Sequence, residues 1–141
     1  MEYISSFIYC DNITIEMTQH GPVHRIMNPI QVLNPIALPS NYSFAIACNI
    51  AGLELEAEYK LRIVFSGPDG EILKDTNDIP VKLPKVGDKE KKGFMQFNLD
   101  FRNVVLRKAD LYTTKVYING KLFGEYKIDV IASGKNGNKS T

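Results

Sequence analysis

The chain has 141 residues, which suits one domain whose core needs no metal or disulfide. Its 17 basic and 16 acidic side chains leave a net charge of +1, so no global field would draw it to nucleic acid or to an anionic membrane. No segment approaches the roughly 20 apolar residues of a membrane span, and the N-terminus lacks the basic region of a signal peptide. We therefore expect a cytoplasmic protein.

The first forty residues read as short strands separated by turns. Residues 3–9 form the first candidate strand, residues 13–17 continue it after a bend, and residues 24–33 hold another short strand. Residues 19–23, with Gly21-Pro22 at their centre, read as a break between them. Prolines at positions 22, 29, 35 and 39 argue against a long helix, because each removes a backbone donor.

The middle of the chain alternates strongly. Residues 42–50 form the clearest strand, with one large apolar face and one face of small residues over which another segment should lie close. Residues 59–65 alternate in the same way and lead into the turn Gly67-Pro68-Asp69-Gly70, after which residues 71–74 return as a strand. Prolines in and after residues 79–83 mark that strand as an edge.

The last third holds the strongest local pattern. Residues 95–101 alternate strictly between apolar and polar, whereas residues 102–109 leave the pattern. Residues 111–130 predict a β-hairpin that turns at Asn119-Gly120, the dipeptide most favoured in two-residue turns. Residues 133–141 are polar and predict a flexible tail after a domain that spans residues 1–132.

These patterns predict an all-β fold, an antiparallel β-sandwich of about seven to eight strands with little or no helix. Tyr112 and the residues around it resemble the tyrosine corner of immunoglobulin-like sandwiches. In that likeness Thr114 stands where antibody domains have a cysteine, so Cys48 has no disulfide partner. We therefore expect packing alone to hold the two sheets together.

A second likeness covers more of the chain. Its motifs are a first strand that ends in Cys10-Asp11, Pro39-Ser40-Asn41-Tyr42 before a central strand, the Pro68-Asp69-Gly70-Glu71 turn, and the Asn119-Gly120 hairpin. Together they resemble a family of uncharacterised bacterial and phage β-sandwich proteins. The chain departs from this pattern at Asp110, where the family usually has glycine, and around Gly21-Pro22, where the family usually has a G-K-x-x-x-x-G hairpin. The resemblance implies the fold but no activity and no functional residues.

The sequence offers no set of residues that would carry a reaction. Cys10, His20 and His24 are the candidate metal ligands, but Gly21-Pro22 disfavours the helix that would place both histidines on one face. Cys10 and Cys48 lie in strand-like surroundings, where inert buried thiols are expected. There is no G-x-S-x-G pattern and no phosphate-binding loop. We predict a protein that is not an enzyme, with no cofactor.

One candidate partner contact stands out on the closing hairpin. Alternation places Tyr117, Lys115 and Thr113 together on the face opposite the core, and an exposed tyrosine is a frequent anchor for a protein partner. We predict a non-catalytic interaction or structural module, an accessory protein of a phage or mobile element, whose partner is a protein or a second copy. The alternative is a small-ligand or glycan-binding sandwich that uses loops 19–23, 52–57 and 85–93.

Overall fold

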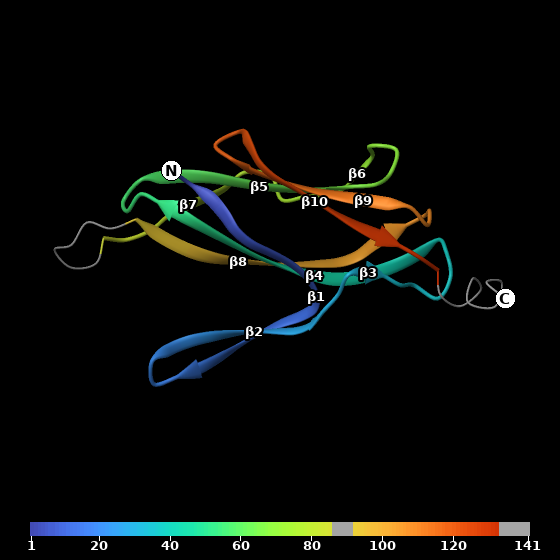
Figure 1. Ribbon diagram of the computed structural model, residues 1–141, viewed down its shortest axis with the longest axis horizontal. Coiled ribbons are helices and arrows are strands. Elements are labelled where there is room, and N and C mark those ends of the chain that lie inside the picture. The colour runs from blue at the N-terminus through green and yellow to red at the C-terminus, as the bar shows by residue number, and fades with distance from the viewer. Residues whose placement is uncertain (86–91, 133–141) are drawn as a thin grey trace.

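The computed structural model describes residues 1–85 and 92–132, and these form two β-sheets packed face to face (Figure 1). The first sheet has four strands in the order β2-β1-β4-β8, which span Gly21–Pro29, Tyr3–Thr18, Ser40–Leu53 and Gly93–Leu106. The second has the order β3-β10-β9-β5-β6, spanning Val32–Leu33, Lys121–Val130, Leu111–Ile118, Glu58–Ser66 and Ile72–Asp75. Strand β7, Ile79–Lys82, also pairs with β5.

This arrangement is an immunoglobulin-like β-sandwich, so the predicted fold class is confirmed. The described residues hold ten strands, and the predicted number of seven to eight was too low. The region around Gly21-Pro22 belongs to strand β2 rather than to a break, and two residues form the short strand β3. Strand β3 runs parallel to β10, whereas the other pairings between described strands are antiparallel. None of the described residues forms a helix that is long and apolar enough to cross a membrane.

The core lies between the two sheets and follows the alternation of the sequence. Strand β4 turns its large apolar side chains toward the second sheet, where those of β5 and β9 meet them. The rings of Phe44, Phe65 and Phe101 form edge-on or tilted contacts at centroid distances of 5.2–6.2 Å. Ala45 and Ala47 point to the other side of β4 and are nevertheless buried, as the predicted close cover of that face requires.

The closing hairpin has the predicted turn and register. Ile118 pairs with Lys121 and Tyr117 with Leu122, while Asn119 and Gly120 both have the positive φ of a type I′ turn. The tyrosine corner is also present, because the Tyr112 hydroxyl donates to the Lys108 carbonyl at 2.9 Å. These two features fix both ends of strand β9.

A polar contact joins the two sheets, so the expectation of packing alone was wrong. Thr114 is fully buried, and its hydroxyl lies 2.7 Å from the Tyr9 hydroxyl of the opposite sheet. The Tyr9 hydroxyl also donates to the Tyr126 carbonyl at 3.1 Å. Next to them the Phe7 and Tyr126 rings stack at 4.0 Å between centroids. Thr114, which occupies the position of one disulfide cysteine of antibody domains, therefore forms a hydrogen bond to Tyr9 of the opposite sheet in this protein.

Candidate functional site

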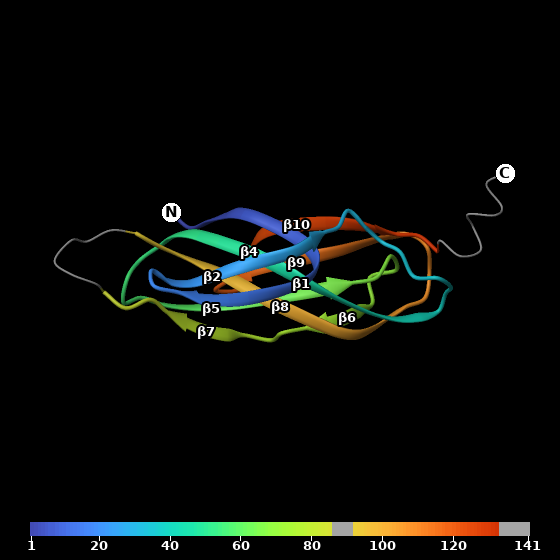
Figure 2. The ribbon, with the colours of Figure 1, turned by 90° about the horizontal axis from the view of Figure 1, so that it is seen from below.

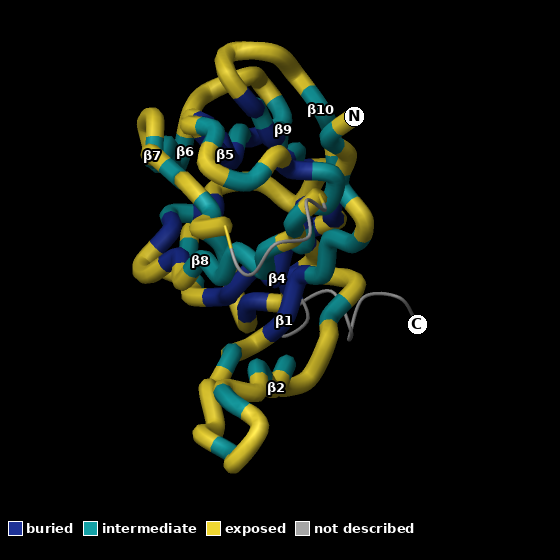
Figure 3. Tube along the Cα trace, turned by 90° about the vertical axis from the view of Figure 1, so that its left-hand side faces the viewer, coloured by how far each residue is buried: buried dark blue, intermediate teal, exposed yellow. Residues whose placement is uncertain are grey.

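The outer half of β1 and the whole of β2 form a hairpin that projects from the sandwich, and we call residues 11–29 the arm. The first half of β1 pairs with β4, and its second half pairs only with β2 among the described strands. Cys10 is the junction, because it pairs with Ala45 on one side and with Pro29 on the other. Figure 3 shows the arm extending away from the two sheets, and Figure 2 shows it crossing the outer face of the first sheet.

The arm exposes apolar side chains on both of its faces. Ile15 and Met17 share one face and are 60% and 74% exposed. Val23 and Met27 lie on the other face and are also exposed. A two-stranded hairpin is marginally stable by itself, and exposed apolar groups of this kind mark interaction surfaces in soluble proteins.

Polar contacts hold the arm in its position. Asn98 of β8 places its amide nitrogen 2.7 Å from Nδ1 of His24, and this contact ties the arm to β8. The Gln96 side-chain amide donates to Oδ1 of Asn98 at 2.8 Å and thereby orients the Asn98 side chain. Within the arm, Arg25 forms an ion pair with Glu16 of the neighbouring strand. The face of the arm that carries His24 and Ile15 is therefore the face turned toward the sheet.

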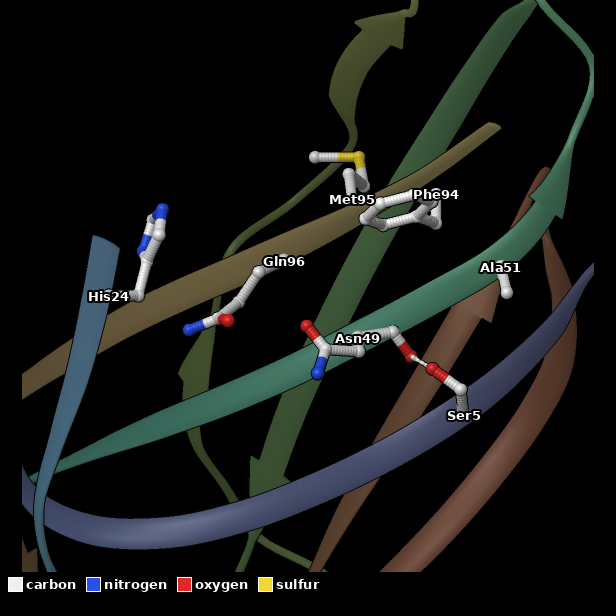
Figure 4. A pocket seen from close by; sticks show the side chains of 7 residues that line it. All are labelled: Ser5, His24, Asn49, Ala51, Phe94, Met95 and Gln96. Atoms are coloured by element: carbon white, nitrogen blue, oxygen red, sulfur yellow. Dashed lines mark hydrogen bonds between the residues drawn. The ribbon is translucent and has the colours of Figure 1, made fainter. Parts of the chain in front are cut away.

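A hollow of about 500 Å³ lies between the arm and the outer face of the first sheet (Figure 4). Its lining comes from all four strands of this sheet: Ser5, His24, Asn49, Ala51, Phe94, Met95 and Gln96. Phe94 is 80% exposed, so the hollow has an aromatic wall that is open to solvent. Asn49 donates to the Ser6 hydroxyl at 2.8 Å and the Ser5 hydroxyl donates to the Asn49 carbonyl at 3.2 Å, which fixes the polar floor.

The predicted contact residues lie on a different surface, the outer face of the second sheet. Thr113, Lys115 and Tyr117 follow one another along β9 and are each half-buried, as the alternation requires. The Arg62 guanidinium lies 5.7 Å from the centre of the Tyr117 ring and forms two hydrogen bonds to Asp75, at 3.0 and 2.6 Å. Tyr117 is therefore partly covered by a fixed cation and offers less free surface than the sequence alone indicated.

The candidate metal ligands do not come together. Within residues 1–85 and 92–132, no group of three or more His, Cys, Asp and Glu side chains could hold a metal ion. Cys10 is fully buried at the base of the arm, while His24 contacts Asn98. Cys48 points into the core, and burial raises the pKa of its thiol to about 12. Neither cysteine forms a disulfide.

Sequence reasoning missed the arm and most of the hollow. Phe94 lies just before the strand predicted at residues 95–101, and Gln96 and Asn49 occupy outer positions of alternating strands, which by themselves indicate no shared site. Their proximity follows from the pairing of β8 with β4, in which Gln96 faces Asn49. Of the three loops considered for a ligand site, residues 85–93 lie mostly outside the described residues, as does the predicted tail at 133–141.

The sandwich, the tyrosine corner and the arm define an immunoglobulin-like β-sandwich protein with a projecting hairpin. The chain belongs to the family of unknown function DUF6941, whose model matches residues 5–131. The resemblance to uncharacterised sandwich proteins is thereby confirmed at the level of an uncharacterised family. No curated protein sequence matches the chain.

Several solved structures are similar to this chain. The alkylpurine DNA glycosylase AlkC of Pseudomonas fluorescens, bound to DNA with an abasic site analog, has a TM-score of 0.50 and 10% identity; the match covers 93% of this chain and 30% of the glycosylase. An immunoglobulin-like protein of Pseudomonas aeruginosa has a TM-score of 0.45 and 14% identity, and the match covers 93% of this chain and 97% of that protein. A β-glucosidase of Listeria innocua, in complex with glucose, has a TM-score of 0.43 and 7% identity, and the match covers 91% of this chain and 16% of the glucosidase. The likeness to the glycosylase concerns the fold alone, and this chain spans less than a third of that enzyme.

Proposed function

We propose that this protein is a non-catalytic interaction module that binds a protein partner through its arm. The observation that carries the proposal is the exposure of apolar side chains on both faces of the arm, at Ile15, Met17, Val23 and Met27. A hairpin that served only to cover the sheet would bury one apolar face and present a polar one. A partner that packs on the arm would remove these side chains from water.

The contacts at the base of the arm support a role in presentation. The pairing of Cys10 with both neighbours and the contact between His24 and Asn98 hold the arm at a fixed angle to the sandwich. A partner then meets an ordered surface, and little conformational entropy is lost on binding. The hollow beside the arm adds the exposed Phe94 ring to the same surface.

The chemistry of the described residues supports the non-catalytic part of the proposal. Burial raises the pKa of both thiols, Cys10 and Cys48, which keeps them protonated and unreactive near neutral pH. Two free cysteines also agree with the proposed cytoplasmic location, where thiols stay reduced. A bacterial or phage origin, and a role as an accessory protein there, belong to the same proposal.

A site-specific cross-link tests the arm directly. A photoreactive amino acid at position 17 should give a discrete protein adduct when the chain is expressed in its source organism, because Met17 is exposed at the outer end of the arm. Position 36 is the matched control, since Ile36 is 78% exposed but lies outside the arm. The adduct at position 17 should disappear when Ile15→Ser is added. Equal cross-linking at positions 17 and 36 would overturn the proposal.

A second candidate function is the binding of a glycan or another small ligand in the hollow. Its support is the combination of the exposed Phe94 ring with the fixed amides of Asn49 and Gln96, because sugars present both apolar faces and hydroxyl groups. A thermal-shift screen with mono- and oligosaccharides should then show a stabilisation that Phe94→Ala removes and Ile72→Ala leaves intact. A screen without any shift would reject this candidate and leave the arm proposal standing.

A further inference from the structure

The described edge strands of the sandwich differ in how well they are protected from pairing with another chain. Strand β3 has two residues, β6 and β7 have four each, and β7 carries Pro80. Strand β2 contains Pro22 and ends at Pro29, neither of which can donate a backbone hydrogen bond. Short length and proline are the usual means by which natural sheets prevent edge-to-edge association.

Strand β8 lacks these protections. It has 14 residues and pairs with β4 alone among the described strands, so its other edge carries unpaired backbone groups. From Gly93 to Phe101 it contains no proline and one charged side chain, Asp100. Beyond this segment Asn103 has a φ of 55° and the register to β4 shifts. A second shift, where Gly93 and Phe94 pair with Leu53 and Ala51, comes from the extra residue Gly52 in β4. A long, regular and nearly uncharged edge of this kind is a template for another strand.

The side chains along this edge leave apolar surface uncovered. Met95, Phe97 and Leu99 point toward the core and pack against it, but each remains only half-buried. On the outer side, Phe94 is largely exposed at the start of the strand. A strand added beside β8 would cover the free sides of these residues as well as pair the backbone groups.

We propose that β8 pairs antiparallel with β8 of a second copy of this chain, so that the two four-stranded sheets become one continuous sheet. A twofold axis at Phe97 uses the whole regular segment, because Gly93 then faces Phe101 of the second copy. In this register Met95 faces Leu99 of the second copy, so the inward side is apolar on both strands.

The same register places no like charges opposite each other. Gln96 faces Asn98 of the second copy, which pairs two neutral amides, and the single carboxylate, Asp100, faces Phe94. A net charge of +1 per chain adds little repulsion between copies. A second copy therefore fits this edge without an unpaired charge, and the interface is isologous, as most homodimer interfaces are. The inference does not require a partner on the arm. The two regions nevertheless meet, because Asn98 of β8 contacts His24 of the arm and Gln96 lines the hollow beside it.

Light scattering on a sizing column tests the inference with the full chain. The wild-type mass should rise with protein concentration from 15.9 kDa toward twice that value. The variant Gln96→Lys/Asn98→Lys would place lysine opposite lysine in the register and should stay monomeric. The variant Gln96→Lys/Asn98→Asp would place lysine opposite aspartate and should dimerise again. Ile72→Lys is the matched control on the edge of the other sheet and should behave like the wild type.

Hydrogen exchange on the wild-type chain tests the same inference without a charged variant, so it applies even if such a variant does not fold. In the wild-type chain, amides of β8 that do not pair with β4 should become more protected as the protein concentration rises, whereas amides of β6 should not change. A wild-type protein that stays monomeric over the whole concentration range would overturn the inference. A dimer whose mass is the same in Gln96→Lys/Asn98→Lys, or whose β8 amides gain no protection, would overturn it as well.

Discussion

The hydrogen bond between Tyr9 and Thr114 should contribute measurably to the stability of the sandwich. Tyr9→Phe removes the hydroxyl that contacts both the Thr114 hydroxyl and the Tyr126 carbonyl. It also leaves the Thr114 hydroxyl buried without this partner, and a buried unpaired polar group costs about 1–3 kcal/mol. We expect the free energy of unfolding to fall by about 2 kcal/mol in Tyr9→Phe. Thr114→Val should cost about 1 kcal/mol, because the Tyr9 hydroxyl keeps its second acceptor.

The double variant separates this contact from general packing. With both hydroxyls replaced by apolar groups of similar shape, neither hydroxyl is left buried without the other, so the two effects should not add. We expect a coupling energy of about 1 kcal/mol in a double-mutant cycle, measured by urea unfolding followed by circular dichroism. Tyr117→Phe is the control, because its hydroxyl lies on the outer face of the second sheet, and it should change stability by less than about 0.5 kcal/mol. Additive effects of the two single changes would refute the reasoning.

Three further predictions concern other parts of the sandwich. Gly124→Ala should destabilise the protein by about 1–3 kcal/mol in urea unfolding, because a Cβ at this position would lie 2.6 Å from the Tyr126 hydroxyl and displace the ring. Burial raises the pKa of the Cys48 thiol to about 12. The contribution of this thiol to the free energy of unfolding should therefore be complete below about pH 9 and be lost as the pH rises toward 12. In Cys48→Ala, the curve of unfolding free energy against pH should be flatter over this range. The hydrogen bond from Arg62 lowers the pKa of the Asp75 carboxyl, and in Arg62→Met an NMR titration should show this pKa rising toward its ordinary value.

Local sequence chemistry was enough to predict much of the second sheet. The Asn119-Gly120 turn fixes the register of β9 and β10, because both residues accept the positive φ that such a turn needs. The alternation along β9 then decides that Tyr112 and Thr114 face the core while Tyr117 does not. These features depend on residues that are neighbours in sequence, so a single sequence is enough to predict them.

The contacts between distant segments could not be read in the same way. Tyr9 and Thr114 meet across the core, and His24 meets Asn98 across the base of the arm, at separations of 105 and 74 residues. Their proximity depends on the order of strands in each sheet, which alternation does not specify. The arm itself was missed because Gly21-Pro22 indicates a turn, whereas in the protein these residues begin the outer strand of a hairpin.

Strand β1 changes its pairing at Cys10, and this divides the first sheet into a part that builds the core and a part that does not. Beyond this residue the pairing is confined to two strands, so a pair of residues added at the tip would lengthen the arm by about 3.4 Å per residue of strand without moving any core side chain. Related chains could therefore differ in how far the arm extends, and in what it contacts, while keeping the same sandwich. If whole cross-strand pairs were removed from the arm, the protein should still fold, and only the length of the arm would differ.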